Sequence, residues 1–277
     1  MIMKTLFIHS ALMTISLILI AFIFSSCIKK ELFDPSLQQE QFDLKSNANG
    51  ATYNIRVGLP SGFDPASKKY ATLYVLDGEN DFEFVSNRCN EISSSMGVTN
   101  VVVVSIGYGK NRSIDYTPTK VSSVTGGGPD FFNFIETQLI TKMQNDYHVD
   151  TTRSGRVIIG HSYGGLFGTY ALLAHNHVFG NYLLLSPSLW YDHKVCLKME
   201  KESESINKNQ KQIIYMAIGG AEEADLMLNP FNEFYNVIQS NYINSKLSKN
   251  IEPNKSHMGS KNPNITKSLN YYFQNRL

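Results

Sequence analysis

The chain has 277 residues, a formal net charge of +1 and 18% charged residues. Its basic residues form no cluster interleaved with aromatic side chains, which argues against nucleic acid as a partner. The length suits one large α/β domain, and no linker rich in proline and glycine divides it. We therefore predict a single folded domain over residues 50–277.

A long apolar segment precedes this domain. Lys4 is followed by a nearly unbroken apolar stretch over residues 6–24 and then by Ser25-Ser26-Cys27. This pattern resembles a bacterial lipoprotein signal over residues 1–27, in which Cys27 is lipidated. The alternative is an uncleaved anchor, because a stretch of that length can span a bilayer. Either way, we expect the domain to be exported and tethered to a membrane, with residues 28–49 as a flexible spacer.

The hydrophobic pattern of the domain alternates between strands and helices. In chain order it predicts strands at 52–59, 71–76, 101–106, 157–159, 182–186 and 212–219, a short polar edge strand at 246–252, and helices at 131–143, 226–244 and 265–273. Strands that alternate with helices form a parallel sheet with right-handed crossovers. We therefore predict the α/β class, with a mostly parallel central sheet and helices on both faces.

The most informative motif is a nucleophile elbow. Residues 160–164 read Gly-His-Ser-Tyr-Gly and stand between the apolar run at 157–159 and a helical run. In such a turn the glycines avoid clashes and the hydroxyl of Ser162 is presented as a nucleophile, which predicts the α/β-hydrolase fold. The N–H of Tyr163 is expected to form half of an oxyanion hole, and the second N–H to come from Gly78 or Glu79.

A serine nucleophile needs a base that accepts its proton. In α/β-hydrolases the chain order is serine, acid, histidine, which leaves His175, His177, His193 and His257 as candidate bases. His257 is the best placed because it lies in a polar loop ahead of the last helix. His175 and His177 fall at the far end of the helix after the elbow, where we expect surface positions. The ring of His161 is expected to face behind Ser162.

The acid should follow the strand at 212–219. Glu222, Glu223 and Asp225 lie in the loop at its tip, and Asp192 after the preceding strand is a fourth possibility. Glu222 has the shortest reach from the strand end, and we predict it as the acid. At least two of the others are then ordinary charges near the start of the helix at 226–244, where negative charge is favourable.

Two further features leave alternatives open. Arg112 lies in a long loop after the strand at 101–106, and it either contacts an acidic group of a substrate or pairs internally with Asp115. Cys89 and Cys196 either pair in an oxidising compartment or remain buried thiols. The sequence has no metal-ligand spacing, so we expect no metal and no cofactor.

Five motifs together carry a family resemblance. They are Tyr-Val-Leu-Asp-Gly at 74–78, Arg112 with Asp-Tyr-Thr-Pro at 115–118, the elbow at 160–167, Ser-Pro-Ser-Leu-Trp at 186–190, and Ser256-His257. In this order they resemble the esterase family of α/β-hydrolases, which includes siderophore esterases of the enterobactin type and esterase D-like enzymes, from about residue 53 to the C-terminus.

The resemblance implies a serine carboxylic ester hydrolase that acts on a small-molecule ester of siderophore, feruloyl or acyl type. By this likeness Ser162 is the nucleophile and His257 the base, and Glu222 matches the acid. Arg112 and Trp190 are the candidate substrate-binding residues. The alternatives are an exported binding protein that has kept the fold without turnover, and a serine acyltransferase or peptidase. Intact Ser162 and His257 argue against the binding protein, and no added propeller or lid domain favours a peptidase.

Overall fold

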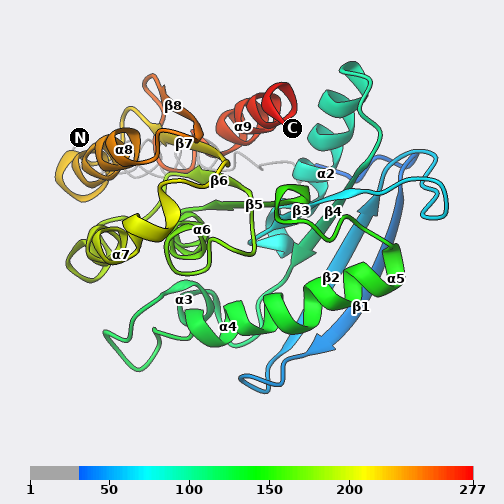
Figure 1. Ribbon diagram of the computed structural model, residues 1–277, viewed down its shortest axis with the longest axis horizontal. Coiled ribbons are helices and arrows are strands. Elements are labelled where there is room, and N and C mark those ends of the chain that lie inside the picture. The colour runs from blue at the N-terminus through cyan, green and yellow to red at the C-terminus, as the bar shows by residue number, and fades with distance from the viewer. Residues whose placement is uncertain (1–30, 277) are drawn as a thin grey trace, which may run out of the picture. The chain divides into compact units, whose positions relative to one another are not determined.

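One eight-stranded sheet forms the centre of the protein in the computed structural model, which describes residues 31–276 (Figure 1). The strand order is β1-β2-β4-β3-β5-β6-β7-β8. The strands are β1 (Gln38–Lys45), β2 (Thr52–Leu59), β3 (Ala71–Val75), β4 (Val101–Ile106), β5 (Arg156–His161), β6 (Asn181–Leu185), β7 (Ile213–Gly219) and β8 (Lys246–Glu252). The pairs β1–β2 and β2–β4 are antiparallel, and all later pairs are parallel.

Helices cover both faces of this sheet, which confirms the predicted α/β-hydrolase fold. They are α2 (Gly78–Ser95), α3 (Arg112–Tyr116), α4 (Gly128–Phe134), α5 (Ile140–Tyr147), α6 (Tyr163–Ala174), α7 (Tyr191–Asn207), α8 (Asn229–Asn241) and α9 (Lys261–Asn275). Two segments are π-helical: η1 (Ile135–Leu139) joins α4 to α5, and η3 (Ala224–Leu228) precedes α8. The short segment η2 (Arg153–Gly155) is a 3-10 helix.

The fully apolar strands are explained by the two cores that they separate. In β4, Val102 and Val104 point into the core shared with α4 to α8, whereas Val101 and Val103 point into the core shared with α2 and α9. Successive side chains of a strand point to opposite faces, so a strand covered on both sides is largely apolar on both faces. Figure 1 shows α2 and α9 on one side of the sheet and α6 on the other.

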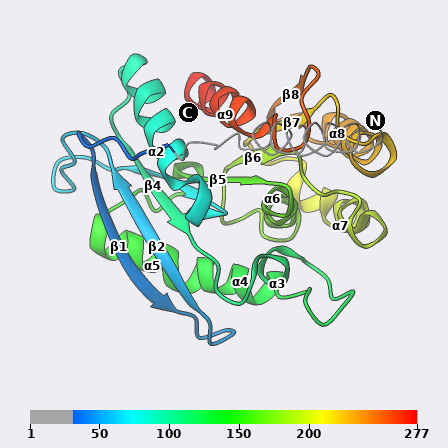
Figure 2. The same ribbon diagram turned by 180° about the vertical axis from the view of Figure 1, so that it is seen from behind.

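The antiparallel end of the sheet corrects one expectation. Residues 28–49 were expected to be a flexible spacer, but residues 38–45 form β1, which pairs with the whole of β2 (Figure 2). Phe42 and Leu44 of β1 are half-buried against the core, and the ring of Phe33 stacks on Phe82 at 5.4 Å between centroids. The compact unit therefore begins at Phe33.

Cys89 in α2 and Cys196 in α7 are both buried free thiols, so the expected alternative of a disulfide is wrong. Burial raises the pKa of each to about 12.

The predicted signal and Cys27 lie outside the described residues. From residue 31 to 276, no helix combines the length and the apolar character needed to cross a bilayer.

The topology gathers the candidate residues at one edge of the sheet. Strands β3, β5, β6, β7 and β8 are parallel, so their carboxyl ends meet at the same edge. The connections that leave these ends carry Asp77, Ser162, Ser186, Glu222 and His257. Ligands of open α/β sheets bind at this edge, outside the carboxyl ends of the strands.

Candidate active site

Ser162 lies in a strained turn between β5 and α6. Its backbone has φ 60° and ψ −119°, outside the conformations that residues with a Cβ ordinarily adopt. Strain of this kind costs about 1–3 kcal/mol and persists only where the surroundings hold it. Here the N–H of Ser162 donates to the carbonyl of Leu185 at 2.9 Å, and the carbonyl of Ser162 accepts from the N–H of Leu166 at 2.9 Å and of Ser188 at 3.2 Å.

The glycines around Ser162 stand where the surrounding backbone leaves no room for a side chain. A Cβ at Gly160 would lie 2.4 Å from the backbone of Gly164, and a Cβ at Gly165 would lie 2.9 Å from the carbonyl oxygen of Leu185. The strand and the helix can therefore approach each other closely enough for the turn only because these positions lack side chains.

Gly160→Ala should consequently disable the elbow. Forcing a methyl group into this space costs about 1–3 kcal/mol or more, because the atom that it meets is backbone and cannot rotate away. We expect a lower melting temperature and loss of most activity even at temperatures where the variant is folded. Gly62→Ala is the matched control, because its φ is +68° but nothing lies within 4 Å of the added Cβ. That variant should lose some stability and keep its kcat, and equal activity losses in both would contradict this account.

His257 is paired with Glu222. The Nδ1 atom of His257 lies 2.7 Å from Oε2 of Glu222, whose side chain is 1% exposed. The other carboxylate oxygen, Oε1, accepts from the hydroxyl of Ser186 at 2.6 Å and from the N–H of Gly219 at 2.8 Å. Burial alone would raise the pKa of Glu222, but the bonds from His257, Ser186 and Gly219 outweigh it and hold that pKa below its ordinary value. Glu222 is thus a buried, ionised carboxylate that fixes the orientation of the imidazole.

The competing carboxylates are occupied elsewhere. Glu223 is the N-cap of η3 and accepts from the N–H groups of Asp225 and Leu226. Asp225 accepts from the side chain of Asn229 at 2.9 Å. Asp192 accepts from the hydroxyl of Thr119 at 2.6 Å. These contacts agree with helix-start and loop roles for the three residues. Among the four candidate carboxylates, Glu222 is the one that contacts the ring of His257.

His161 lies against the loop that carries His257. Its Nε2 atom is 3.0 Å from the backbone carbonyl of His257, and the two rings are 4.5 Å apart between centroids. Because a carbonyl only accepts, Nε2 carries the proton and donates it. Burial, with smaller effects of His257 and Lys261, lowers the pKa of His161 to about 3. His161 is therefore a neutral donor that ties the elbow to the histidine loop.

His175 and His177 follow the far end of α6 and lie away from this edge. His177 is exposed, as expected, and its Nε2 is 2.8 Å from Glu136. His175 differs from the expectation of a surface position, because it is half-buried, stacks on Phe132 at 3.9 Å between ring centroids and contacts the hydroxyl of Tyr170.

The N–H groups expected to bind an oxyanion begin two helices. Tyr163 is the first residue of α6, and Gly78 and Glu79 are the first two of α2. The N–H groups in the first turn of a helix have no intrahelical acceptor and point at a ligand placed before it. Gly78 also lets α2 start close to β4, because a Cβ there would lie 2.8 Å from the backbone nitrogen of Ile106.

The hydroxyl of Ser162 lies 3.5 Å from the hydroxyl of Ser188, which follows β6. Ser188 is 3% exposed. Trp190 is half-buried next to this serine, with its ring 6.2 Å from that of Tyr163 between centroids. The residue after the nucleophile and the residue two positions after Ser188 therefore carry neighbouring aromatic rings.

Arg112 has a partner that the sequence did not predict. Its guanidinium binds the carboxylate of Asp77 through Nε at 2.6 Å and Nη2 at 2.9 Å. The expected alternative of a pair with Asp115 is wrong, because Asp115 instead accepts from the hydroxyl of Tyr53 and the N–H groups of Gly109 and Lys110. The sequence pattern did not reveal this pair because Arg112 and Asp77 are 35 positions apart in the chain.

Sequence reasoning also missed Asp77, Ser186 and Ser188 as site residues. Each stands inside a motif quoted for the family resemblance, within three residues of the end of β3 or β6. Asp77 and Ser186 have positive φ angles of 57° and 40°. Their position at strand ends was the signal available in the sequence.

Comparison with known proteins places this arrangement in a family. A family model described as "Putative esterase" matches residues 46–260. The chain belongs to this esterase family. It is 30% identical to ferri-bacillibactin esterase BesA of Bacillus subtilis over 200 aligned residues, and these cover 65% of this chain and 68% of that protein. It is 27% identical to the siderophore triacetylfusarinine C esterase of Aspergillus fumigatus over 206 aligned residues, which cover 68% of this chain and 70% of that protein.

Solved structures agree on the fold of this esterase. The crystal structure of BES protein from Bacillus cereus superimposes with a TM-score of 0.75 at 24% identity, covering 89% of this chain and 98% of that one. A complex of the enterobactin hydrolase IroE with DFP gives a TM-score of 0.69 at 24% identity, covering 87% and 97%. The family model and the relative from Bacillus subtilis confirm, at the level of the family, the resemblance drawn from the five sequence motifs.

Proposed function

We propose that this esterase is a serine hydrolase in which Ser162 is the nucleophile, His257 the general base and Glu222 the orienting acid. The observation that carries the proposal is the 2.7 Å contact between His257 and the buried Glu222, at the sheet edge where Ser162 occupies its strained turn. A carboxylate that is hydrogen-bonded to Nδ1 keeps the imidazole proton on that nitrogen, so Nε2 is free to accept a proton from the serine hydroxyl.

The reaction follows from these positions. The hydroxyl of Ser162 turns from Ser188 to Nε2 of His257, which takes its proton as the oxygen attacks the ester carbonyl carbon. The carbonyl oxygen becomes an oxyanion that the N–H groups at the starts of α6 and α2 stabilise. When the intermediate collapses, the carbon–oxygen bond to the alcohol breaks and His257 returns the proton to the leaving alcohol. Water then repeats the sequence on the acyl-enzyme and releases the acid.

The substrate is proposed to be a small-molecule ester of the siderophore, feruloyl or acyl type. Support comes from the relatives, which are named as a ferri-bacillibactin esterase and a siderophore triacetylfusarinine C esterase. The neighbouring rings of Tyr163 and Trp190, which follow Ser162 and Ser188 in the chain, add aromatic surface. Assays of the purified protein on p-nitrophenyl acetate, feruloyl esters and catecholate trilactones would rank these classes by kcat/KM. Turnover of none of them would contradict the proposed hydrolase.

Export is the second part of the proposal. The apolar segment and Ser25-Ser26-Cys27 support a lipid-anchored protein that acts outside the cytoplasm.

Cys27→Ser should therefore leave the protein unprocessed or release it into the soluble fraction, because the side chain that carries the lipid is removed. Mass spectrometry of the N-terminal peptide and membrane fractionation measure the two effects. Cys89→Ser is a matched control, since this buried thiol should not alter fractionation. An unmodified Cys27 still joined to Phe24 in the wild type would favour the uncleaved anchor instead.

A further inference from the structure

His257 is carried by an exposed loop at the edge of the sheet. The loop over residues 253–260 follows β8, which is the last strand of the sheet, and residues 253–256 are exposed. The side chain of Met258, directly after His257, is 65% exposed. A general base nevertheless needs an accurate position, because a misplacement of about 1 Å can cost 10²-fold in rate. The contacts that fix this loop therefore bear on catalysis.

Two hydrogen bonds hold the backbone of His257. Its carbonyl accepts from Nε2 of His161 at 3.0 Å and from the hydroxyl of Ser260 at 3.1 Å. Ser260 is fully buried and is the N-cap of α9, which starts at Lys261. The position of His257 thus depends on where the start of α9 lies.

Lys261 stands at an unfavourable position in its own helix. It is the first residue of α9, whose first turn has no acidic residue. The N-terminus of a helix carries a partial positive charge, so a cation there is destabilising. In addition, Ser260 forms no side-chain cap with the described part of α9. Departures from local rules of this kind are expected at functional sites, where a distant contact compensates for them.

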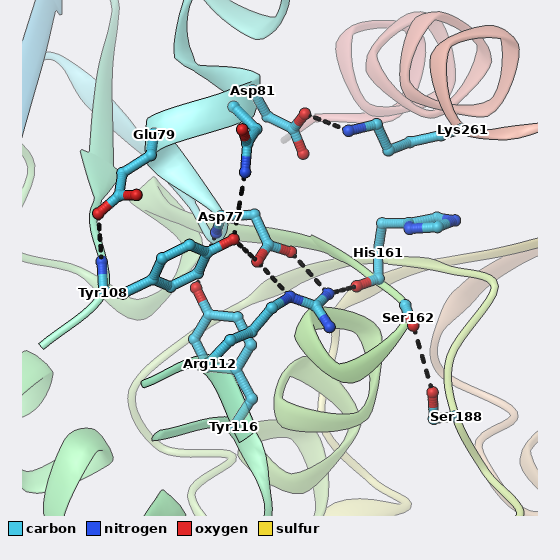
Figure 3. Close-up of polar contacts among 11 residues, drawn as sticks. Asp77, Glu79, Asp81, Tyr108, Arg112, Tyr116, His161, Ser162, Ser188 and Lys261 are labelled. Carbon is cyan, nitrogen blue, oxygen red and sulfur yellow. Dashed lines mark hydrogen bonds and ion pairs between the residues drawn. The ribbon is translucent and has the colours of Figure 1, made fainter. Parts of the chain in front are cut away.

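That contact is an ion pair with Asp81 of α2. Nζ of Lys261 binds Oδ1 of Asp81, 180 positions away in the chain. The two side chains are 16% and 8% exposed, and burial raises the pKa of Asp81 above its ordinary value, although Lys261 opposes this shift. Figure 3 shows Lys261 extending from α9 to Asp81. Because Asp81 lies three residues after Gly78, the pair joins the end of the histidine loop to the helix start expected to supply an oxyanion donor.

Apolar side chains already pack α2 against α9. Both helices contribute to one buried core, through Phe82, Val85, Cys89, Ile265, Leu269 and Tyr272. Hydrophobic attraction is non-directional, so it does not by itself select one register of the two helices. A buried ion pair does, because separating it leaves each charge unpaired away from water. Replacing such a pair by apolar groups is often neutral or stabilising, so stability alone does not account for its presence.

We propose that Lys261 and Asp81 form a positioning pair that fixes the histidine loop relative to the start of α2. The role presupposes the proposed serine hydrolase mechanism, in which His257 deprotonates Ser162 while an N–H at the start of α2 binds the oxygen that becomes the oxyanion. Both groups act on the same ester carbonyl, so the distance between the histidine loop and α2 must match that carbonyl in the transition state.

Asp81→Leu combined with Lys261→Met tests this role most sharply. The double variant replaces the buried pair by apolar side chains, so the melting temperature should stay the same or rise. An apolar contact lacks a fixed direction, so kcat should fall by at least about tenfold with KM little changed. Rates on p-nitrophenyl acetate and thermal unfolding followed by circular dichroism measure the two effects. A stable double variant that keeps kcat within about threefold would overturn the proposal.

Single variants keep the test decisive if the double variant folds poorly. Lys261→Arg retains a cation for Asp81 and should keep kcat within about threefold, because the contact is to one carboxylate oxygen. Lys261→Gln removes the cation and should lose kcat by at least about tenfold at a temperature where it is folded. Equal losses of kcat in the two variants would overturn the role of the charge pair.

Two esters separate positioning from substrate contact. Lys261→Gln should lose kcat by the same factor on the neutral p-nitrophenyl acetate and on the anionic p-nitrophenyl succinate. A rise in KM confined to the anionic ester would overturn the proposal and assign Lys261 to substrate binding. If the wild-type protein turns over neither ester, the proposed function fails. If it turns over both and Lys261→Gln keeps its kcat within about threefold, only the positioning role fails.

Lys267→Gln is the matched control on the same helix. Lys267 pairs with Glu252 at the end of β8, and its side chain is 48% exposed. Exposed ion pairs contribute little to stability, and this one joins α9 to β8 rather than to α2. The variant should keep kcat within about threefold. An equal loss of kcat in Lys267→Gln and Lys261→Gln would show that any charge removed from α9 has this effect, which contradicts a specific role of the contact with Asp81.

Discussion

Ser162→Ala should reduce kcat by about 10⁴-fold or more while the protein remains folded. Removal of a serine nucleophile leaves only the catalysis supplied by binding and the oxyanion hole. The substitution deletes one hydroxyl, whose contact in the structure is the 3.5 Å approach to Ser188, so the melting temperature should change little. Rates on p-nitrophenyl acetate, with circular dichroism as the check on folding, measure both effects.

Ser188→Ala is the control for the identity of the nucleophile. Ser188 is the other hydroxyl at this position, but its N–H donates to the carbonyl of Ser162 and it is 3% exposed. We expect this variant to keep kcat within about tenfold, a barrier change of about 1.4 kcal/mol. A fluorophosphonate probe should label Ser162 in both the wild type and Ser188→Ala. Labelling of Ser188, or retention of a tenth of the wild-type kcat by Ser162→Ala, would be incompatible with the assignment.

The parts of the fold that could be predicted are those with a strong local pattern. The apolar runs at 101–106 and 212–219 became β4 and β7, because buried parallel strands must be apolar on both faces. Even the polar run at 246–252 was placed correctly, as the edge strand β8. The elbow was readable because its glycines, strand and helix are contiguous in the sequence.

The parts that could not be predicted lack such a pattern or depend on distant contacts. β1 reads Gln-Gln-Glu-Gln-Phe-Asp-Leu-Lys, and an edge strand with two apolar residues resembles a spacer until its partner β2 is known. The pair of Arg112 with Asp77 joins segments 35 residues apart. Asp115, three residues along the chain from Arg112, was the nearer carboxylate in sequence but bonds to Tyr53 instead.

Glu222→Gln should lower kcat at least a hundredfold with KM little changed. The carboxylate orients His257 and stabilises the imidazolium formed during attack, and its loss slows a triad by about 10⁴. An amide at this position can present an N–H to Nδ1, which favours the wrong tautomer of the imidazole. Glu223→Gln and Asp225→Asn are the matched controls, because their contacts are to the start of η3 and to Asn229. Both should stay within a few fold of wild type, since charges at a helix start contribute about 0.3–1 kcal/mol to stability.

Stability measurements give Glu222 a second, independent readout. The folded state holds the pKa of Glu222 below its ordinary value, so its ionised form stabilises the fold above the unfolded-state pKa of about 4.3, and this contribution is lost as pH falls through the folded pKa. The free energy of unfolding of the wild type should therefore exceed that of Glu222→Gln most at neutral pH, and the difference should shrink in acid. Urea unfolding at pH 7 and pH 4 measures it. If Asp225→Asn shows the large loss of kcat instead of Glu222→Gln, Glu222 is not the ionised partner of His257. The same conclusion follows if the difference in the free energy of unfolding grows on acidification.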